Sequence, residues 1–383
     1  MSRSYGLWRS MRFSLIALIT LGTALILTPC AEAQNLRSLF ERMDANLNNG
    51  QGYSSSLNTK GTLAWGEGYL LMAYVDMYRS TGDRSWLDKL VDQFDTVLSN
   101  RDDVLHIKDY YRNKPIAGWG SDEYSSGKWH VWAVHTAMIC EGPMEFVELV
   151  KAEQRLKKPY SKIAARYLIK IKECVAAQDP YWHDGPGPME GYYSDPAIGP
   201  LPLNQQNALG MLNLGLYLVT RDHLYRNRVE RLAMFFKKRI RIRPDGSYDW
   251  SYWPKPDGSG TDSEDISHAA INVAFACKCA KAHIVFNKAD MMAFVKTWML
   301  HVHRADGVWA DDINGDGGEN TYMPAAVWGW SYLCPYDHKI LSDMTLSCSS
   351  ITEDQTNGAN LLALASVLRW EHALTKKHRW LWW

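Results

Sequence analysis

The fold is decided by the stretch Ser263-Glu264-Asp265-Ile266-Ser267-His268-Ala269-Ala270. Two acidic residues open a helix of small apolar residues, and a histidine follows one turn later. Ser263 is predicted as the N-cap, and Glu264 and Asp265 in the first turn complement the helix dipole. His268 lies three residues beyond Asp265, on nearly the same helical face. The stretch therefore predicts a proton-transfer side chain at the start of a helix.

An aromatic segment precedes this helix. Residues 248–254 read Tyr-Asp-Trp-Ser-Tyr-Trp-Pro, which we interpret as a loop rather than a core strand. The histidine thus follows directly behind a set of aromatic rings that could support a ligand.

Helical periodicity extends along most of the chain, whereas β-alternation is scarce. Turns with related sequences, Thr81-Gly82-Asp83 and Thr220-Arg221-Asp222, join successive helices. We expect helix pairs over 65–78 and 86–98, over 129–150 and 160–176 with a break at 157–159, over 204–219 and 223–236, and from 264 to about 301 with a turn at 287–288. A fifth pair begins near 322, and a last helix covers about 357–374.

Long loops rich in aromatic, glycine and acidic residues follow the second helix of each pair, over 110–124, 181–195, 248–260 and 308–322. Equivalent loops of antiparallel helix pairs emerge on one face. The sequence therefore predicts an all-α fold, an (α/α) toroid or incomplete barrel of helix hairpins, with an open solenoid as the alternative. Small residues suited to a crowded inner ring favour the toroid: Gly66, Gly68, Ala208, Gly210, Ala269, Ala270, Ala325 and Ala326.

Composition narrows the class of protein. Apolar residues make up 46% and charged residues 22% of the 383 residues, which is typical of a globular protein. The formal net charge is +0, so nothing favours nucleic acid as a partner. Trp 17 and Tyr 20 are unusually high; such rings fill cores, and they also form stacking platforms in sugar-binding clefts.

The N-terminus has the pattern of a secretory signal peptide over residues 1–33, followed by a single domain over 34–383. Arginines precede the apolar run 14–27, and Ala31-Glu32-Ala33 offers a cleavage site. A retained membrane anchor and a lipoprotein box at Cys30 are the alternatives; the run is short for a spanning helix, and Pro29 argues against the box. We expect a secreted or periplasmic protein without membrane contact after cleavage.

Six cysteines follow the signal, and an oxidising compartment permits them to pair. Cys334 and Cys348 are the likeliest pair by proximity in sequence. Cys277 and Cys279 lie on an apolar helix and are interpreted as buried thiols. No spacing matches a zinc site.

Candidate functional residues gather at the starts of the inner helices, next to the long loops. Amides, histidines and a tyrosine surrounded by aromatic rings suit proton abstraction from a uronic acid. In β-elimination an amide, arginine or protonated acid stabilises the developing enolate. A histidine or tyrosine accepts the C5 proton, and a tyrosine protonates the leaving oxygen. No metal or other cofactor is required.

We therefore assign His268 as the base, Tyr322 as the acid and Asn204 as the amide, with His135 as a further catalytic candidate. The structural alternatives are a buried helix histidine, a packing tyrosine and an N-cap asparagine. His130 and His135 are five residues apart and do not form a metal pair. Predicted substrate contacts are Trp119, His130, Gln205, Asn207, Trp250, Tyr252 and Glu264, with Arg112, Lys114, Lys128 or Lys255 for substrate carboxylates.

Two further chemistries remain open. Asp312, Asn314 and Asp316 match the first half of a calcium loop, but the glutamate at its twelfth position is replaced by Met323, so only a looser site with Glu319 is conceivable. Hydrolysis needs two carboxylates at a defined separation. Its candidates are Glu67, Glu264, Asp265 and the consecutive pair Asp311 and Asp312.

At three segments, 204–210, 264–269 and 306–330 with Tyr322, the chain resembles the (α/α)-toroid polysaccharide lyases, and it is most similar to the alginate and glucuronan lyase family numbered thirty-eight. The resemblance covers about residues 50 to 375. It implies endolytic β-elimination of an acidic polysaccharide, with Tyr322 and His268 as the proton-transfer pair. Related toroids include epimerases and glycoside hydrolases, and a non-catalytic carbohydrate-binding protein is the remaining alternative.

Overall fold

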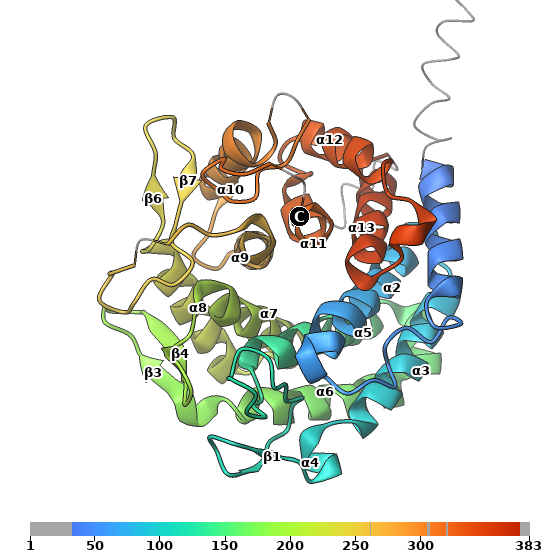
Figure 1. The fold of residues 1–383 in the computed structure, drawn as a ribbon, viewed down its shortest axis with the longest axis horizontal. Coiled ribbons are helices and arrows are strands. Elements are labelled where there is room, and N and C mark those ends of the chain that lie inside the picture. The colour runs from blue at the N-terminus through green and yellow to red at the C-terminus, as the bar shows by residue number, and fades with distance from the viewer. Residues whose placement is uncertain (1–32, 261, 305–306, 319–320, 376–383) are drawn as a thin grey trace, which may run out of the picture.

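The computed structural model describes residues 33–260, 262–304, 307–318 and 321–375. Within these ranges six helices form an inner ring around a common axis (Figure 1). Each inner helix contacts the next, and the last contacts the first, so the ring closes. The (α/α) toroid is confirmed. Its inner helices are α2 (Gly68–Thr81), α5 (Ala133–Ala152), α7 (Leu203–Thr220), α9 (Ile266–Lys281), α11 (Met323–Trp330) and α13 (Gly358–Thr375).

An outer layer of helices surrounds this ring. Each is antiparallel to its inner partner, which places the starts of all inner helices on one face. The outer helices are α3 (Ser85–Ser99), α6 (Gln154–Ala176), α8 (His223–Lys237), α10 (Lys288–Thr297) and α12 (His338–Cys348), and a helix over 33–46 packs Phe40 against Trp86 of α3. Short helical segments adjoin them: η1 (Thr59–Gly61), η2 (Leu63–Glu67), α4 (Asp102–Leu105), η3 (Asp179–Tyr181), η4 (Trp298–Val302), η5 (Ser331–Leu333) and η6 (Glu353–Gln355).

The strands over 114–115, 182–184, 191–195 and 248–249 lie inside loops that the sequence predicts to be long, and those over 108–109, 199–200 and 241–242 lie just outside them. All strand pairings of the described chain are antiparallel. The strand order β3-β4-β5 makes the largest sheet. Residues 248–249, at the start of the segment predicted as a loop over 248–254, form a short strand that pairs with residues 241–242. The strands are β1 (Lys108–Asp109), β2 (Lys114–Pro115), β3 (Trp182–Asp184), β4 (Gly191–Asp195), β5 (Gly199–Pro200), β6 (Arg241–Ile242) and β7 (Tyr248–Asp249).

Close contact between inner helices depends on small residues, as the sequence predicts. A Cβ atom on Gly329 of α11 would collide with the backbone carbonyl of Ala270 on α9. The indole of Trp330 donates to the carbonyl of Ile266 at 3.0 Å, which fixes the start of α9 against α11. Packing at this junction therefore positions the first turn of α9.

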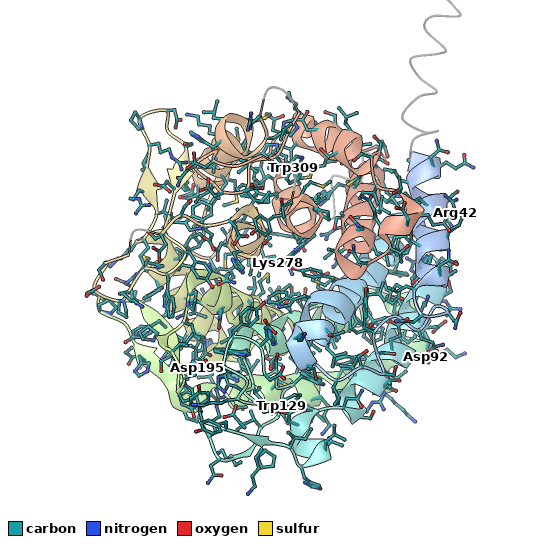
Figure 2. The ribbon with its side chains drawn as sticks, viewed as in Figure 1. Arg42, Asp92, Trp129, Asp195, Lys278 and Trp309 are labelled. Carbon is teal, nitrogen blue, oxygen red and sulfur yellow. The ribbon has the colours of Figure 1, made fainter. Side chains whose placement is uncertain are left out.

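Charged side chains from several inner helices meet at the ring centre, beyond the first turns. Lys278 of α9 is bonded to Glu141 and Glu145 of α5, and Figure 2 shows Lys278 near the middle of the ring. Arg79 of α2 binds Glu145 at 2.6 Å, and Arg369 of α13 binds Asp76 at 2.9 Å. Burial disfavours the charged form of Lys278 and lowers its pKa, but the neighbouring carboxylates of Glu141 and Glu145 outweigh burial and raise that pKa.

Two local predictions are wrong. The break between the second helix pair lies at Glu153 rather than at 157–159, because the buried face of α6 continues past Pro159 with Tyr160 and Ala164. The N-cap of α9 is Asp265 rather than Ser263: its side chain accepts hydrogen bonds from the backbone N–H groups of Ser267 and His268.

The predicted pairing of Cys334 with Cys348 is also wrong, because all six described cysteines are free and buried. The buried thiols expected at Cys277 and Cys279 are present. Among the described residues no helix has the length and apolarity needed to cross a bilayer. The predicted signal peptide lies almost entirely outside the described residues and stays a prediction.

Candidate functional site

The first turn of α9 forms one side of the candidate site. Asp265 Oδ1 accepts hydrogen bonds from the backbone N–H groups of Ser267 at 2.9 Å and His268 at 3.0 Å. Its other oxygen, Oδ2, binds Nδ1 of His268. Burial alone would raise the pKa of Asp265, but the bond to His268 and its charge hold that pKa below its usual value. Asp265 thus caps the helix and orients the imidazole.

The imidazole of His268 is also stacked on an aromatic ring. The ring of Tyr252 lies 5.0 Å away, centroid to centroid, at an interplanar angle of 29°. The side chain of His268 retains 35% exposure. A ligand can therefore reach a histidine whose ring is fixed on one edge by Asp265 and on one face by Tyr252.

The segment before α11 pairs with the segment before α9. Ile266 N donates to the carbonyl of Asp311 at 3.1 Å, and Ile313 N donates to the carbonyl of Glu264 at 3.0 Å. This pairing places Asp311 and Asp312 beside the first turn of α9, although the two segments are far apart in sequence.

A cavity of about 430 Å³ opens between these segments. It brings together the predicted base His268 and the predicted acid Tyr322, whose ring is partly exposed. The stacking residue Tyr252 lines it as well. The remaining lining residues are Ser263, Asp265, Asp311, Asp312, Asp316 and Gly317.

The lining of this cavity is acidic. Both carboxylate oxygens of Asp312 accept hydrogen bonds. Its Oδ2 accepts from Ser263 Oγ at 2.7 Å, and its Oδ1 accepts from two backbone N–H groups. Oδ1 of Asp311, by contrast, is buried and has no hydrogen-bond partner among the described residues. No lysine or arginine of the described chain lines the cavity.

Solved structures share this architecture over nearly their full length. An inactive variant of the α-1,6-mannanase from Salegentibacter sp., in which two consecutive aspartates are replaced by asparagine, gives a TM-score of 0.56 at 12% identity, covering 90% of this chain and 99% of that chain. The unsaturated glucuronyl hydrolase from Bacillus sp. GL1 gives 0.54 at 13%, covering 90% and 98%. A polysaccharide lyase gives 0.53 at 10%, covering 90% and 99%.

This likeness shows the fold. At such low identity it does not single out the lyase family numbered thirty-eight, because hydrolases and a lyase match about equally well. No protein-family model and no curated protein matches the sequence.

Glu264, Trp250 and Asn207, which the sequence predicts as substrate contacts, form a buried network instead. Glu264 accepts from the indole of Trp250 and, at 2.9 Å, from Asn272, which in turn accepts from Asn207 at 2.6 Å. Burial, and secondarily the charge of Asp265, raises the pKa of Glu264 well above its usual value. These three predictions are corrected, because all three side chains are fully buried.

Asn204 and Gln205 lie in the first turn of α7, which contacts α9. Both are largely buried, and their amide oxygens have no hydrogen-bond partner among the described residues. They do not line the cavity of His268. Their predicted roles stay predictions.

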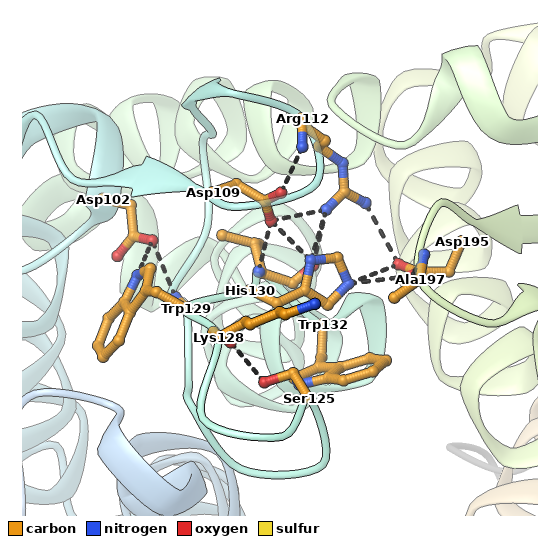
Figure 3. A network of polar contacts seen from close by, with 12 residues as sticks. Asp102, Asp109, Arg112, Ser125, Lys128, Trp129, His130, Trp132, Asp195 and Ala197 are labelled. Carbon is orange, nitrogen blue, oxygen red and sulfur yellow. Dashed lines mark hydrogen bonds and ion pairs between the residues drawn. The ribbon is translucent and has the colours of Figure 1, made fainter.

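His130 lies outside the site. It bridges two buried carboxylates, with Nδ1 at 2.8 Å from Asp109 and Nε2 at 3.0 Å from Asp195, and Arg112 joins the same network (Figure 3). Burial lowers the pKa of His130, but the two aspartates outweigh it and raise that pKa. The predicted substrate contact is corrected: His130 and Arg112 fasten the loop before α5 to the sheet containing β4.

His135 and Trp119 are also buried. His135 Nδ1 lies 3.2 Å from Asn58 Nδ2, and burial, then the charge of His130, lowers its pKa to about 3. The imidazole is therefore neutral at ordinary pH. Trp119 donates to the carbonyl of Val97 at 2.9 Å and offers no free face to a sugar, which corrects that prediction.

The predicted basic substrate contacts do not line the cavity of His268, and the predicted calcium ligands do not all line it. Lys128 lies 4.5 Å above the ring of Tyr110, Lys255 lies 3.9 Å above the ring of Trp253, and Lys114 lies in β2. The oxygen of Asn314 accepts from Arg243 at 2.7 Å, and Glu319 lies outside the described residues. Among described residues no three His, Cys, Asp or Glu side chains converge as metal ligands.

Three residues of this region are not predicted from the sequence: Asp109, Asp195 and Tyr124. Asp109 and Asp195 were not singled out, because their partners are distant in sequence. Tyr124 ends one predicted loop, and its ring centroid lies 6.2 Å from that of His135. The tyrosine-rich composition of that loop was the available signal.

Proposed function

We propose that the protein is an enzyme that cleaves a polysaccharide by β-elimination at a uronate unit. The observation that carries the proposal is that His268 and Tyr322 line one cavity although they start different helices. Both were predicted as the proton-transfer pair from the sequence.

The bonds of His268 define its role. Because Nδ1 is held by Asp265, Nε2 is the nitrogen left to accept the C5 proton. The carboxylate of Asp265 then stabilises the imidazolium that forms, and the ring of Tyr252 holds the imidazole plane. The hydroxyl of Tyr322 donates a proton to the leaving glycosidic oxygen.

Neutralisation of the substrate carboxylate requires hydrogen-bond donors, since the developing enolate is negative. The sequence predicts this role for the amides of Asn204 and Gln205, at the start of the neighbouring helix α7. The partner is then an acidic polysaccharide met outside the cytoplasm, in keeping with the predicted signal peptide.

The test is incubation of the purified protein with alginate, glucuronan and other polyuronates. β-Elimination produces a C4–C5 double bond, so ultraviolet absorbance rises. His268→Ala and Tyr322→Phe should each lower turnover by about a hundredfold or more, with the circular dichroism spectrum retained. Binding of a polyuronate without any cleavage would overturn the proposal in favour of a non-catalytic carbohydrate-binding protein.

The acidic lining of the cavity favours a second candidate, hydrolysis of a glycosidic bond. Its oxocarbenium-like transition state is positively charged and is stabilised by carboxylates such as those of Asp311 and Asp312. Two consecutive aspartates are replaced in the inactive mannanase variant as well. Hydrolysis predicts that reducing ends increase without ultraviolet absorbance, and that Asp311→Asn and Asp312→Asn abolish activity while Tyr322→Phe does not.

A further inference from the structure

The backbone of the loop before α5 is unusual at Tyr124. Its φ angle is 62°, in the left-handed region, and Ser126 and Gly127 follow at 55° and 78°. This region is natural for glycine and rare for a bulky residue. Such a conformation persists only where the surrounding structure fixes it, and it often occurs where a side chain must be presented in one direction.

The loop around Tyr124 is in fact held at several points. Ser121 and His130 exchange backbone hydrogen bonds of 2.9 Å at its base. The indole of Trp132 donates to the carbonyl of Glu123 at 3.0 Å, and the hydroxyl of Ser125 bonds back to the loop at Asp122. Figure 3 shows Trp132 beside His130, whose bridge to two aspartates anchors this region. The direction of Tyr124 is therefore set by the fold.

The ring of Tyr124 is exposed to solvent beside the start of α5. Tyr124 is 70% exposed, yet its ring lies 6.2 Å from that of His135 at the start of α5. The ring of His135 lies 5.4 Å from that of Trp65, at the start of the α2 region. Tyr124 and the partly exposed Trp65 thus flank His135 on the face that carries the candidate site.

The loop of Tyr124 precedes α5 and Tyr252 precedes α9, and both of these inner helices pack against α7. The pKa of Tyr252 is raised to about 12, first by burial and then by the charges of Glu264, Asp265 and Tyr124. Tyr252 is the ring that stacks on His268. The loops that carry Tyr124 and Tyr252 thus lead into two inner helices of the same ring.

We propose that Tyr124 is a substrate-binding residue, whose exposed ring, carried on a fixed backbone, stacks on a sugar unit adjacent to the unit that is cleaved. This inference rests on the proposed function in taking a glycan as the ligand. A fixed aromatic ring loses little conformational freedom on binding, and its apolar face matches the C–H face of a pyranose. Tyr124 takes no part in proton transfer.

The test compares variants of Tyr124 in the full-length protein, on the polyuronate or neutral glycan that the wild type cleaves. Tyr124→Ala should raise KM about five- to tenfold, the range expected for loss of one stacking contact, and change kcat less than about threefold. Tyr124→Phe should keep KM within about twofold, because the ring remains. A KM for Tyr124→Ala within twofold of the wild-type value would overturn the inference.

Glycine variants separate the ring from the backbone. Tyr124→Gly relieves the left-handed conformation, so its Tm should equal or exceed that of the wild type while its KM rises as in Tyr124→Ala. The matched control is Ser126→Gly, which relieves the same conformation two residues away and should leave KM unchanged. A raised KM in Ser126→Gly would mean that loop geometry, not the ring, determines binding, and would refute the assignment.

Affinity electrophoresis in gels containing each glycan distinguishes the two proposals. Retardation of wild type and His268→Ala, lost in Tyr124→Ala, supports the stacking role even if no glycan is cleaved, which refutes only the proposed function. Cleavage with unchanged retardation of Tyr124→Ala refutes only the stacking role. A wild-type protein that neither cleaves nor is retarded by any glycan refutes both.

Discussion

Glu67, buried at the start of the inner ring, should make the stability of the protein depend on pH. Its Oε2 accepts from Tyr53 N at 2.7 Å, whereas its Oε1 is buried without a hydrogen-bond partner in the described structure. Burial raises the pKa of Glu67 from 4.5 to about 8. The folded protein therefore holds this proton far more tightly than the unfolded chain does.

The size of the effect follows from that difference. A raised carboxyl pKa gives stability that is complete below about pH 4.5 and is lost as pH rises to about 8. Each pH unit in this window removes about 1.4 kcal/mol, so the whole window removes roughly 5 kcal/mol. Glu67→Gln cannot ionise, and it keeps an oxygen for the bond from Tyr53.

The assay is urea unfolding followed by tryptophan fluorescence between pH 5 and pH 9. The difference in unfolding free energy, variant minus wild type, should rise with pH by about 1.4 kcal/mol per unit and level off above pH 8. Taking the difference cancels the pH dependence that other carboxyls with raised pKa values, such as Asp102 and Glu148, give to both proteins. The exposed Glu41→Gln is the matched control and should give a flat line. A flat line for Glu67→Gln as well would refute the reasoning.

Other perturbations have equally definite outcomes. Lys278→Met should lower the unfolding free energy by about 3–5 kcal/mol in urea titrations, because it leaves the buried carboxylate of Glu141 without its cation while Glu145 keeps Arg79; a loss below about 1 kcal/mol would contradict the network. Asp265→Asn keeps an N-cap side chain but removes the carboxylate beside His268, so turnover should fall more than about tenfold with unchanged helicity; unchanged turnover would exclude that orienting role. Alkylation of the unfolded, unreduced protein followed by mass spectrometry should modify both Cys334 and Cys348, since both are free thiols; protection of the two would restore the pairing predicted from sequence.

The architecture could be predicted because its signals are local. Helical spacing and small residues specify α9 and its contact with α11, and the structure places Ala270 against Gly329 as a crowded ring requires. The cap of α9 was assigned to Ser263 because serine and aspartate cap helices equally well. The helix begins after Asp265 because this segment pairs with residues 311–313. That pairing joins residues far apart in the chain, so no local sequence pattern predicts it.

The site could be predicted only in part, for the same reason. His268 and Tyr322 were found because each opens an inner helix beside a long loop. The role of His130 was missed because its carboxylate partners lie 21 and 65 residues away. Trp250 was misassigned because a tryptophan in an aromatic segment suits a sugar platform and a core equally, and only the buried carboxyl of Glu264 distinguishes them.

The charged cluster around Lys278 has a consequence for how a polymer would approach the ring. Side chains from α2, α5, α9 and α13 meet at the axis at that level, so they close the central opening of the ring there. A long chain could not be pulled through it. Any polymer handled here must lie across the rim or dip one end inside, and whatever is released must leave by the way it came.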